Sequence, residues 1–203
     1  AIPAPVGPVC GGATSFLGLP DYDNYQSKLP IIDVATATLS AQIGPGAFGL
    51  GFNGARATLD GTRAVVWGTG SSTTTFGFVS VLDLTAEPPV SLGGLSGGNG
   101  TQALQTVELL EDQTRCVVVT ANAQTDGGLR ILDLADASEL GQFPRKQTQK
   151  GYNGVAIVPG GEHIVAWSEG QPGISGYGYY VALDVAGEVL SETGYHAGTV
   201  ETT

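Results

Sequence analysis

Short apolar runs recur along the chain with a period of about 50 residues. One phrase, an aliphatic residue followed by Asp and a second aliphatic residue, occurs four times, at 32–34, 82–84, 132–134 and 183–185. Its aspartates are 50, 50 and 51 residues apart, and they are Asp33, Asp83, Asp133 and Asp184. Self-similarity at a constant period indicates a repeat protein in which each repeat forms the same structural unit.

Each repeat contains four apolar runs rather than one. A second run precedes each Asp phrase, at 14–17, 64–67, 116–119 and 164–167. A turn signal precedes that run, and further apolar stretches lie before the turn and after the Asp phrase. Runs of four to seven residues rich in Val, Ile, Leu and Thr, separated by Gly-containing turns, predict short strands. Four such strands in succession predict one antiparallel sheet per repeat, which is the blade of a β-propeller.

We therefore predict an all-β fold, a β-propeller of four four-stranded antiparallel blades that form a single domain over residues 1–203. The near-continuous apolar runs are typical of sheets covered on both faces, so neighbouring blades must stack. The first repeat carries Pro3, Pro5 and Pro8 where its innermost strand is expected, which confines that stretch to an edge or a loose strand. The predicted blades span approximately 1–48, 49–98, 99–148 and 149–198, with 199–203 as a candidate closing strand.

The blade pattern of residues 59–84 carries a family resemblance. Its apolar residue, the Asp-Gly-Thr-Arg turn, the Ala-Val-Val run and the final Val-Ser-Val-Leu-Asp-Leu strand resemble blades of the YVTN/LVIVD-type propellers. They are also similar to blades of lactonase-like and surface-layer propellers, and the resemblance is clearest from 50 to 197. It implies a propeller fold but leaves the function open, because this architecture hosts enzymes, binding modules and surface proteins alike.

The number of repeats leaves the closure of the propeller open. Members of the resembled family usually carry seven blades, whereas this chain holds four. Three arrangements remain: a small closed ring of four blades, two chains paired into an eight-bladed ring, or four blades that form part of a larger ring. The second arrangement makes a homo-oligomer a candidate state.

Composition narrows the classes of partner. The 203 residues include 8 Lys and Arg against 19 Asp and Glu, giving a formal net charge of −11. This acidic balance argues against a nucleic-acid partner, which requires clustered basic residues, and against an anionic membrane surface. No apolar run approaches the length of a membrane span. The chain begins Ala-Ile-Pro-Ala, as expected after removal of a signal peptide, which predicts an extracellular, cell-surface or periplasmic location.

Export would permit two covalent modifications. Cys10 and Cys116 are the only cysteines, and an even pair in an exported protein suggests a disulfide. The alternatives are intermolecular pairing, or free thiols with Cys116 as a buried strand residue. Asn99 opens an Asn-Gly-Thr sequon in a predicted loop between blades, so it is a glycosylation candidate.

The acidic residues give little sign of a metal or a reaction. The repeated aspartates Asp33, Asp83, Asp133 and Asp184 end predicted strands, where a carboxylate accepts hydrogen bonds from turn amides. Asp21, Asp23 and Asn24 alternate like part of a calcium loop, although no distal Glu completes the set, so calcium is the one candidate cofactor. Spacing signals for zinc or covalent haem are absent from the sequence.

Long predicted loops at 18–29, 68–77, 120–128 and 168–177 are the candidate binding face. Their aromatic residues stand among Gly, Ser and Thr, a composition suited to protein or glycan contact, and they are Tyr22, Tyr25, Phe76 and Tyr177. We therefore predict an exported scaffold or interaction module that binds a protein, a glycan or further copies of itself, and no enzyme activity is indicated. The alternative is a lactonase-like or other hydrolytic propeller with a metal in its central channel.

Overall fold

The computed structural model contains fifteen strands within the residues that it describes, and all of them belong to four antiparallel sheets. The described residues are 15–17, 29–33, 37–43, 53–68, 77–96, 102–122, 128–144, 152–168, 179–186 and 189–197. This confirms the predicted all-β class and the repeated antiparallel sheets.

Each sheet is formed by one repeat, and its strands pair in the order in which they occur along the chain. The first sheet contains β1 (Ser15–Leu17), β2 (Leu29–Asp33) and β3 (Thr38–Ile43). The second contains β4 (Gly54–Ala57), β5 (Arg63–Gly68), β6 (Phe78–Asp83) and β7 (Val90–Ser96). The third contains β8 (Gln102–Leu109), β9 (Arg115–Asn122), β10 (Gly128–Asp133) and β11 (Glu139–Pro144). The fourth contains β12 (Gly154–Ile157), β13 (His163–Ser168), β14 (Tyr179–Ala186) and β15 (Val189–Ala197).

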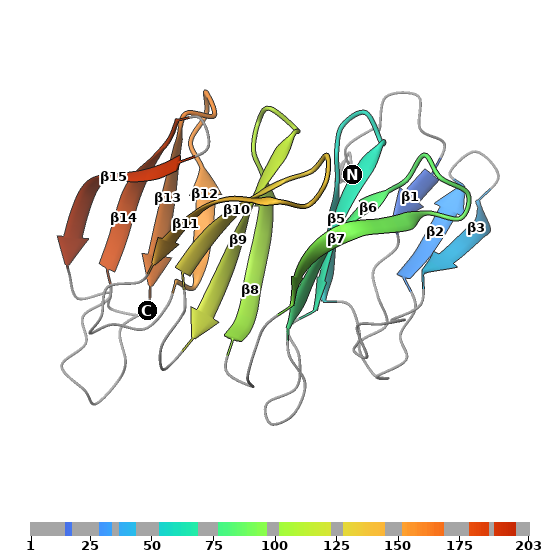
Figure 1. Cartoon of the computed structure of the whole chain (residues 1–203), viewed down its shortest axis with the longest axis horizontal. Coiled ribbons are helices and arrows are strands. Elements are labelled where there is room, and N and C mark those ends of the chain that lie inside the picture. The colour runs from blue at the N-terminus through green and yellow to red at the C-terminus, as the bar shows by residue number, and fades with distance from the viewer. Residues whose placement is uncertain are drawn as a thin grey trace, which may run out of the picture.

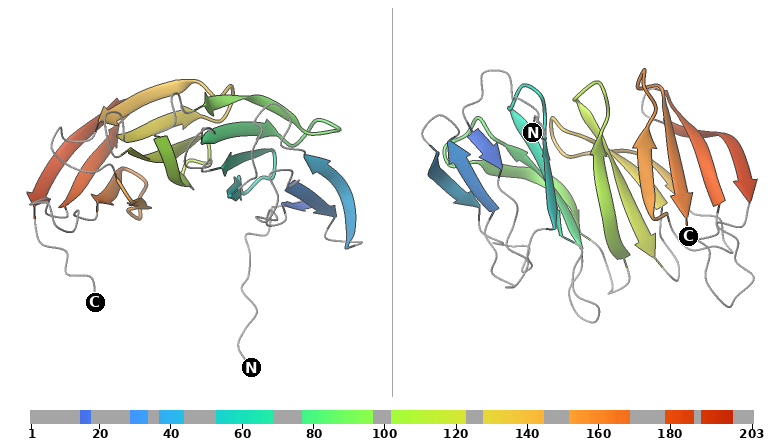
Figure 2. Two further views of the ribbon diagram at one scale, coloured as in Figure 1. Left: turned by 90° about the horizontal axis from the view of Figure 1, so that it is seen from below. Right: turned by 180° about the vertical axis from the view of Figure 1, so that it is seen from behind.

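The four sheets follow one another in chain order along an open arc (Figures 1 and 2). The first strands of the last three sheets lie on the concave side, where β8 contacts both β4 and β12. The last strands lie on the convex side, where β11 contacts β15. Of the three closures that the sequence leaves open, the arc corresponds to those in which four blades form part of a larger ring.

All four sheets contain a β-bulge at the same place. The register between the last two strands shifts just before the repeated Asp, between Ile31 and Ile32, Val81 and Leu82, Ile131 and Leu132, and Ala182 and Leu183. Each shift leaves one extra residue on the outer strand, which bends that strand and increases its twist. Because the four sheets share this register, equivalent residues of different repeats point in equivalent directions.

Apolar contacts between sheets form the interior. We call the face of a sheet that turns toward the next sheet in the chain its forward face, and the opposite face its rear face. The forward face of the second sheet packs on the rear face of the third in one apolar cluster, to which Val65, Trp67, Cys116 and Val118 belong. A second cluster joins the third and fourth sheets in the same way. Cys116 and its neighbour Val117 are both fully buried although they point to opposite faces, so the third sheet is covered on both sides.

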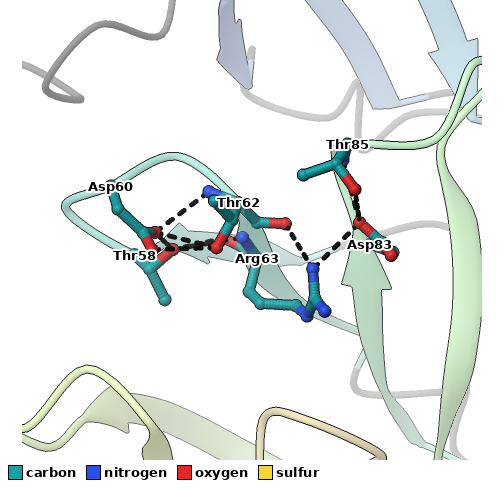
Figure 3. A network of polar contacts seen from close by, with 6 residues as sticks. All are labelled: Thr58, Asp60, Thr62, Arg63, Asp83 and Thr85. Carbon is teal, nitrogen blue, oxygen red and sulfur yellow. Dashed lines mark hydrogen bonds and ion pairs between the residues drawn. The ribbon is translucent and has the colours of Figure 1, made fainter.

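Polar turns cap the hairpins at one end of the second sheet (Figure 3). In the turn between β4 and β5, Asp60 accepts hydrogen bonds from the Thr58 hydroxyl, from the Thr62 amide at 3.0 Å and from the Thr62 hydroxyl at 3.0 Å. These bonds lower the pKa of Asp60, the Thr58 hydroxyl having the largest effect. The turn repeats in the third and fourth sheets, since Gly61, Gln113 and Gly161 all have a left-handed backbone at the equivalent position.

Arg63 connects this turn to the one after β6. Its guanidinium donates to the Thr62 carbonyl at 3.0 Å and to the Asp83 carboxylate at 2.9 Å. Asp83 also accepts hydrogen bonds from the Thr85 hydroxyl at 2.6 Å and the Thr85 amide at 2.9 Å. The hydroxyl and the amide, in that order, lower the pKa of Asp83, and the positive charge of Arg63 adds to the effect.

We predict that the buried Cys116 thiol resists modification in the folded protein. Burial raises the pKa of Cys116 to about 12, so almost no thiolate exists at neutral pH, and the side chain is inaccessible to a reagent. In a Cys10→Ser variant, which leaves Cys116 as the only cysteine, Ellman's reagent should react no faster than the protein unfolds. Rapid reaction without denaturant would contradict this packing. Thiol titration of the denatured wild-type chain, without reductant, tests the predicted disulfide in parallel.

We predict that Asp83 makes stability fall in acid. Because its pKa is lowered by folding, the carboxylate stabilises the protein above its unfolded pKa of about 3.9, and this contribution is lost as the pH falls through the folded pKa. An Asp83→Asn variant should unfold at lower urea than wild type at about pH 7 and lose less on transfer to about pH 3. Thr85→Val, which removes only the hydroxyl donor, should give a smaller change. Equal pH dependence of the wild type and Asp83→Asn would refute the role of this carboxylate.

Candidate interaction surface

The forward face of the fourth sheet is the most exposed aromatic surface among the described residues. Trp167 of β13 and Tyr180 of β14 are directly opposite each other in the sheet, so they project from the same face. Their side chains are 41% and 50% exposed, respectively. Trp167 lies over Gly154 of β12, because a Cβ added to that glycine would overlap the indole ring. The result is two exposed aromatic side chains next to each other on one face of the sheet.

The second sheet contains the same local arrangement, but there the third sheet covers it. Trp67 lies over Gly54, and its cross-strand partner on β6 is Val79. However, Trp67 is only 7% exposed, because the cluster that contains it extends to Leu104 and Val107 of β8 in the third sheet. The two tryptophans therefore have the same surroundings within their own sheets. Their exposure differs because a following sheet covers only the first of them.

An exposed apolar side chain also lies at the opposite end of the arc. Leu39 of β3 is directly opposite Ile32 of β2, so both residues occupy one face of the first sheet. Leu39 is 54% exposed and Ile32 is half-buried. The residues that correspond to Leu39 in the next two sheets, Ser91 and Glu139, are exposed as well. Solvent therefore reaches this position in all three sheets, and Leu39 by itself does not mark a contact between sheets.

Polar contacts between successive turns hold the last three sheets in line. The amide of Leu59 donates to the Gln113 side chain at 3.0 Å, and the amide of Gly160 donates to the Glu111 carboxylate at 3.1 Å. Burial alone would raise the pKa of Asp112, but hydrogen bonds from the Thr114 amide and Arg115 lower it overall. These side chains and amides form hydrogen bonds with one another. We call the edge formed by the turns between the first two strands of the last three sheets the turn edge, and we assign it a structural role.

The structure describes only some of the site residues that the sequence predicts. Asp83 and Asp133 accept hydrogen bonds from the amides of Thr85 and Ala135, at 2.9 and 2.7 Å. Asp33 ends β2. Asp184 does not end its strand, contrary to the prediction, because β14 continues to Ala186 and Asp184 is opposite Ser191 of β15.

Of the other predicted site residues, only Cys116 lies within the described residues. Cys116 has a free, buried thiol between the second and third sheets. The other candidates lie outside the described residues, and they are Cys10, Asp21, Tyr22, Asp23, Asn24, Tyr25, Phe76, Asn99 and Tyr177. Within the described residues, no group of three or more His, Cys, Asp or Glu side chains is arranged to hold a metal ion. The same part of the chain contains no helix that could span a membrane.

Sequence reasoning missed the residues of the two end faces. A signal for Trp167 was present, because Asn-Gly at 53–54 followed by Trp67 recurs as Asn-Gly at 153–154 followed by Trp167. This recurrence identifies a forward-face position in the last repeat of the chain. It does not reveal the exposure of the side chain, which depends on whether another sheet follows.

Comparison with solved structures identifies the fold. The chain is similar to a protein in the "Crystal Structure of Mitotic Checkpoint Complex", with 13% identity and a TM-score of 0.57, over 91% of this chain and 53% of that one. It is also similar to "KlHsv2 with loop 6CD replaced by a Gly-Ser linker", with 10% identity and a TM-score of 0.55, over 89% of this chain and 58% of that one. No family model matches the chain, and neither does any curated protein.

These similarities extend to architecture alone. The two matches are distant structural relationships to β-propeller proteins, and they assign no family. The chain spans little more than half the length of each. The fold is therefore that of a β-propeller, as the repeat predicts, and its function has to be argued from its own surfaces.

Proposed function

We propose that this protein is an interaction scaffold that binds other protein chains through the exposed face of its fourth sheet. The observation that carries the proposal is the exposure of Trp167 and Tyr180 at positions whose equivalents in the second sheet, Trp67 and Val79, are buried between sheets. Tyr and Trp are enriched where proteins bind one another, because each provides a large rigid contact area.

The fold supports this function in two further ways. The propeller architecture commonly serves in protein interactions, and the stacked sheets present the aromatic pair on a rigid support. Backbone hydrogen bonds hold β13 between β12 and β14, and the absence of a side chain at Gly154 lets the indole lie against β12. Such packing restricts the indole and so reduces the side-chain entropy that it loses on binding.

The remaining sequence predictions extend the proposal. Protein or glycan contact through the loops that carry Tyr22, Tyr25, Phe76 and Tyr177 remains part of it. An extracellular, cell-surface or periplasmic location is supported by the resemblance of residues 59–84 to the blades of YVTN/LVIVD-type and surface-layer propellers. No observation on the described residues favours the hydrolytic alternative.

We predict that position 180 contacts another protein in intact cells of the source organism. Replacing Tyr180 with the photo-crosslinker p-benzoylphenylalanine should give a discrete protein adduct on irradiation, because that position is half exposed beside Trp167. The matched control places the crosslinker at Leu59, which is 54% exposed on the turn edge. A second control adds Trp167→Asp, which should abolish the adduct by placing a charge in the contact.

Two results would count against the function. One is the absence of an adduct at position 180, and the other is an identical set of adducts at positions 59 and 180. The cell fraction that yields the adduct tests the proposed location at the same time.

A further inference from the structure

The aromatic pair of the fourth sheet differs in kind from the pairs that join sheets elsewhere. On the two central strands, the corresponding forward-face pairs of the second and third sheets are Trp67 with Val79 and Val119 with Leu129. All four of these side chains are buried by the following sheet. Each covered pair thus contains at most one aromatic side chain, whereas Trp167 and Tyr180 are both aromatic. The side chains themselves, and not only their exposure, set this face apart.

Two large side chains next to each other do not suit a further sheet of the same kind. Stacked sheets lie about 10 Å apart, and side chains fill the space between them at high density. In the second sheet, Trp67 and Val79 already share this space with Val107 of β8. Tyr180 adds an aromatic ring where the second sheet has only a valine, and added volume destabilises a packed interior. A single extended chain is thinner than a sheet and avoids this overpacking.

Small side chains lie beside the aromatic pair on the same face. Residues two positions apart in a strand point to the same side, which places Val165 and Ala182 next to Trp167 and Tyr180. Ala156 of β12 lies opposite Val165 and completes this row. Ala156 is exposed, and the other two side chains are half-buried. A row without long side chains leaves room for an extended chain that runs along the strands.

A carboxylate lies on the same face beyond the row of small side chains. Asp184 is four positions from Tyr180 along β14, which is about 13 Å in a strand, and it is half-buried opposite the exposed His163. The whole chain has a formal net charge of −11. A basic group on the partner is therefore attracted at long range, and Asp184 is the carboxylate on this face that can receive it.

We propose that the occupant of this face is a proline-rich segment of another protein that carries a basic residue about four positions from its prolines. The inference rests on the proposed function, since it names the partner of the same Trp167 and Tyr180 surface. Proline-rich chains are extended before they bind and form no internal hydrogen bonds, and they dock on surfaces lined by aromatic side chains. Such a chain rises about 3.1 Å per residue, so about four residues span the distance from Tyr180 to Asp184.

The experiment measures the binding of a fluorescein-labelled peptide to the purified full chain by fluorescence anisotropy. The peptide is Pro-Pro-Pro-Pro-Ala-Ala-Ala-Arg, in which the arginine follows the last proline by about four positions. We expect saturable binding that weakens as salt is added, because the arginine contact is electrostatic. Two control peptides require no change to the protein. Replacing the prolines with Gly and Ser should weaken binding roughly tenfold, and replacing the arginine with Glu roughly fivefold.

Protein variants assign each contact. Trp167→Ala and Tyr180→Ala should each weaken binding roughly tenfold, because each removes an aromatic side chain from the contact. Asp184→Lys should weaken binding of the arginine peptide and strengthen binding of the glutamate peptide, a reversal that a misfolded variant would not give. Leu59→Ala, at an exposed apolar residue of the turn edge, should bind as the wild type does. In Trp67→Phe, which leaves Trp167 as the only tryptophan, the peptide should protect its fluorescence from acrylamide.

Four outcomes would overturn the inference. They are no binding of the arginine peptide, binding that Trp167→Ala and Tyr180→Ala leave unchanged, no reversal in Asp184→Lys, and binding of an oligosaccharide in place of the peptide. The last of these would assign the face to a glycan.

The crosslinker at position 180 separates failure of the inference from failure of the proposed function. An adduct to a different protein, without peptide binding, would refute the proline-rich partner and leave the interaction function standing. An adduct that mass spectrometry of the digest places within the same polypeptide would refute both, because the face would then be covered from within the protein. Absence of peptide binding and of any adduct would also refute the two proposals together.

Discussion

Apolar packing of one sheet face on the next is the interaction on which the rest of the structure depends. On β9, the neighbouring residues Cys116 and Val117 point to opposite faces, and each is buried against a different sheet. A sheet of this composition cannot bury two apolar faces alone, so each repeat depends on a neighbouring sheet for its stability. The same requirement makes the two ends of the arc chemically different from its middle.

Polar groups have a different role, which is local. Arg63, Asp83 and Thr85 connect the turns of one sheet, and Glu111 and Gln113 reach only the turn of an adjacent sheet. Hydrogen bonds are directional, so these contacts fix how the hairpins end and how neighbouring sheets align. Apolar burial supplies the attraction between sheets, and the polar turn edge supplies the alignment. Charged residues of this edge are therefore better understood as structure than as a catalytic site.

Function in this architecture is a property of surfaces. Similarity to distant propellers defines the arrangement of sheets, and the same arrangement serves unrelated activities in other proteins. The aromatic pair of the fourth sheet derives from the repeat itself, because Trp167 and Tyr180 occupy positions that join sheets elsewhere in the chain. Interaction through this face needs no new structural device beyond the one that holds the sheets together.

The sequence by itself determined the repeat, its period, the four-stranded antiparallel unit and the position of the turns, because strand periodicity and turn chemistry are local properties of the chain. It did not reveal the bulge that all four sheets share, the continuation of β14 past Asp184, or the open arc. Tertiary structure alone decided which of two tryptophans in nearly the same local setting is buried. Trp67 and Trp167 each lie over a glycine of their own sheet, yet one is buried and the other exposed. The physical reason is that burial is set by the neighbouring sheet, and a residue's own sequence does not encode whether that neighbour is present.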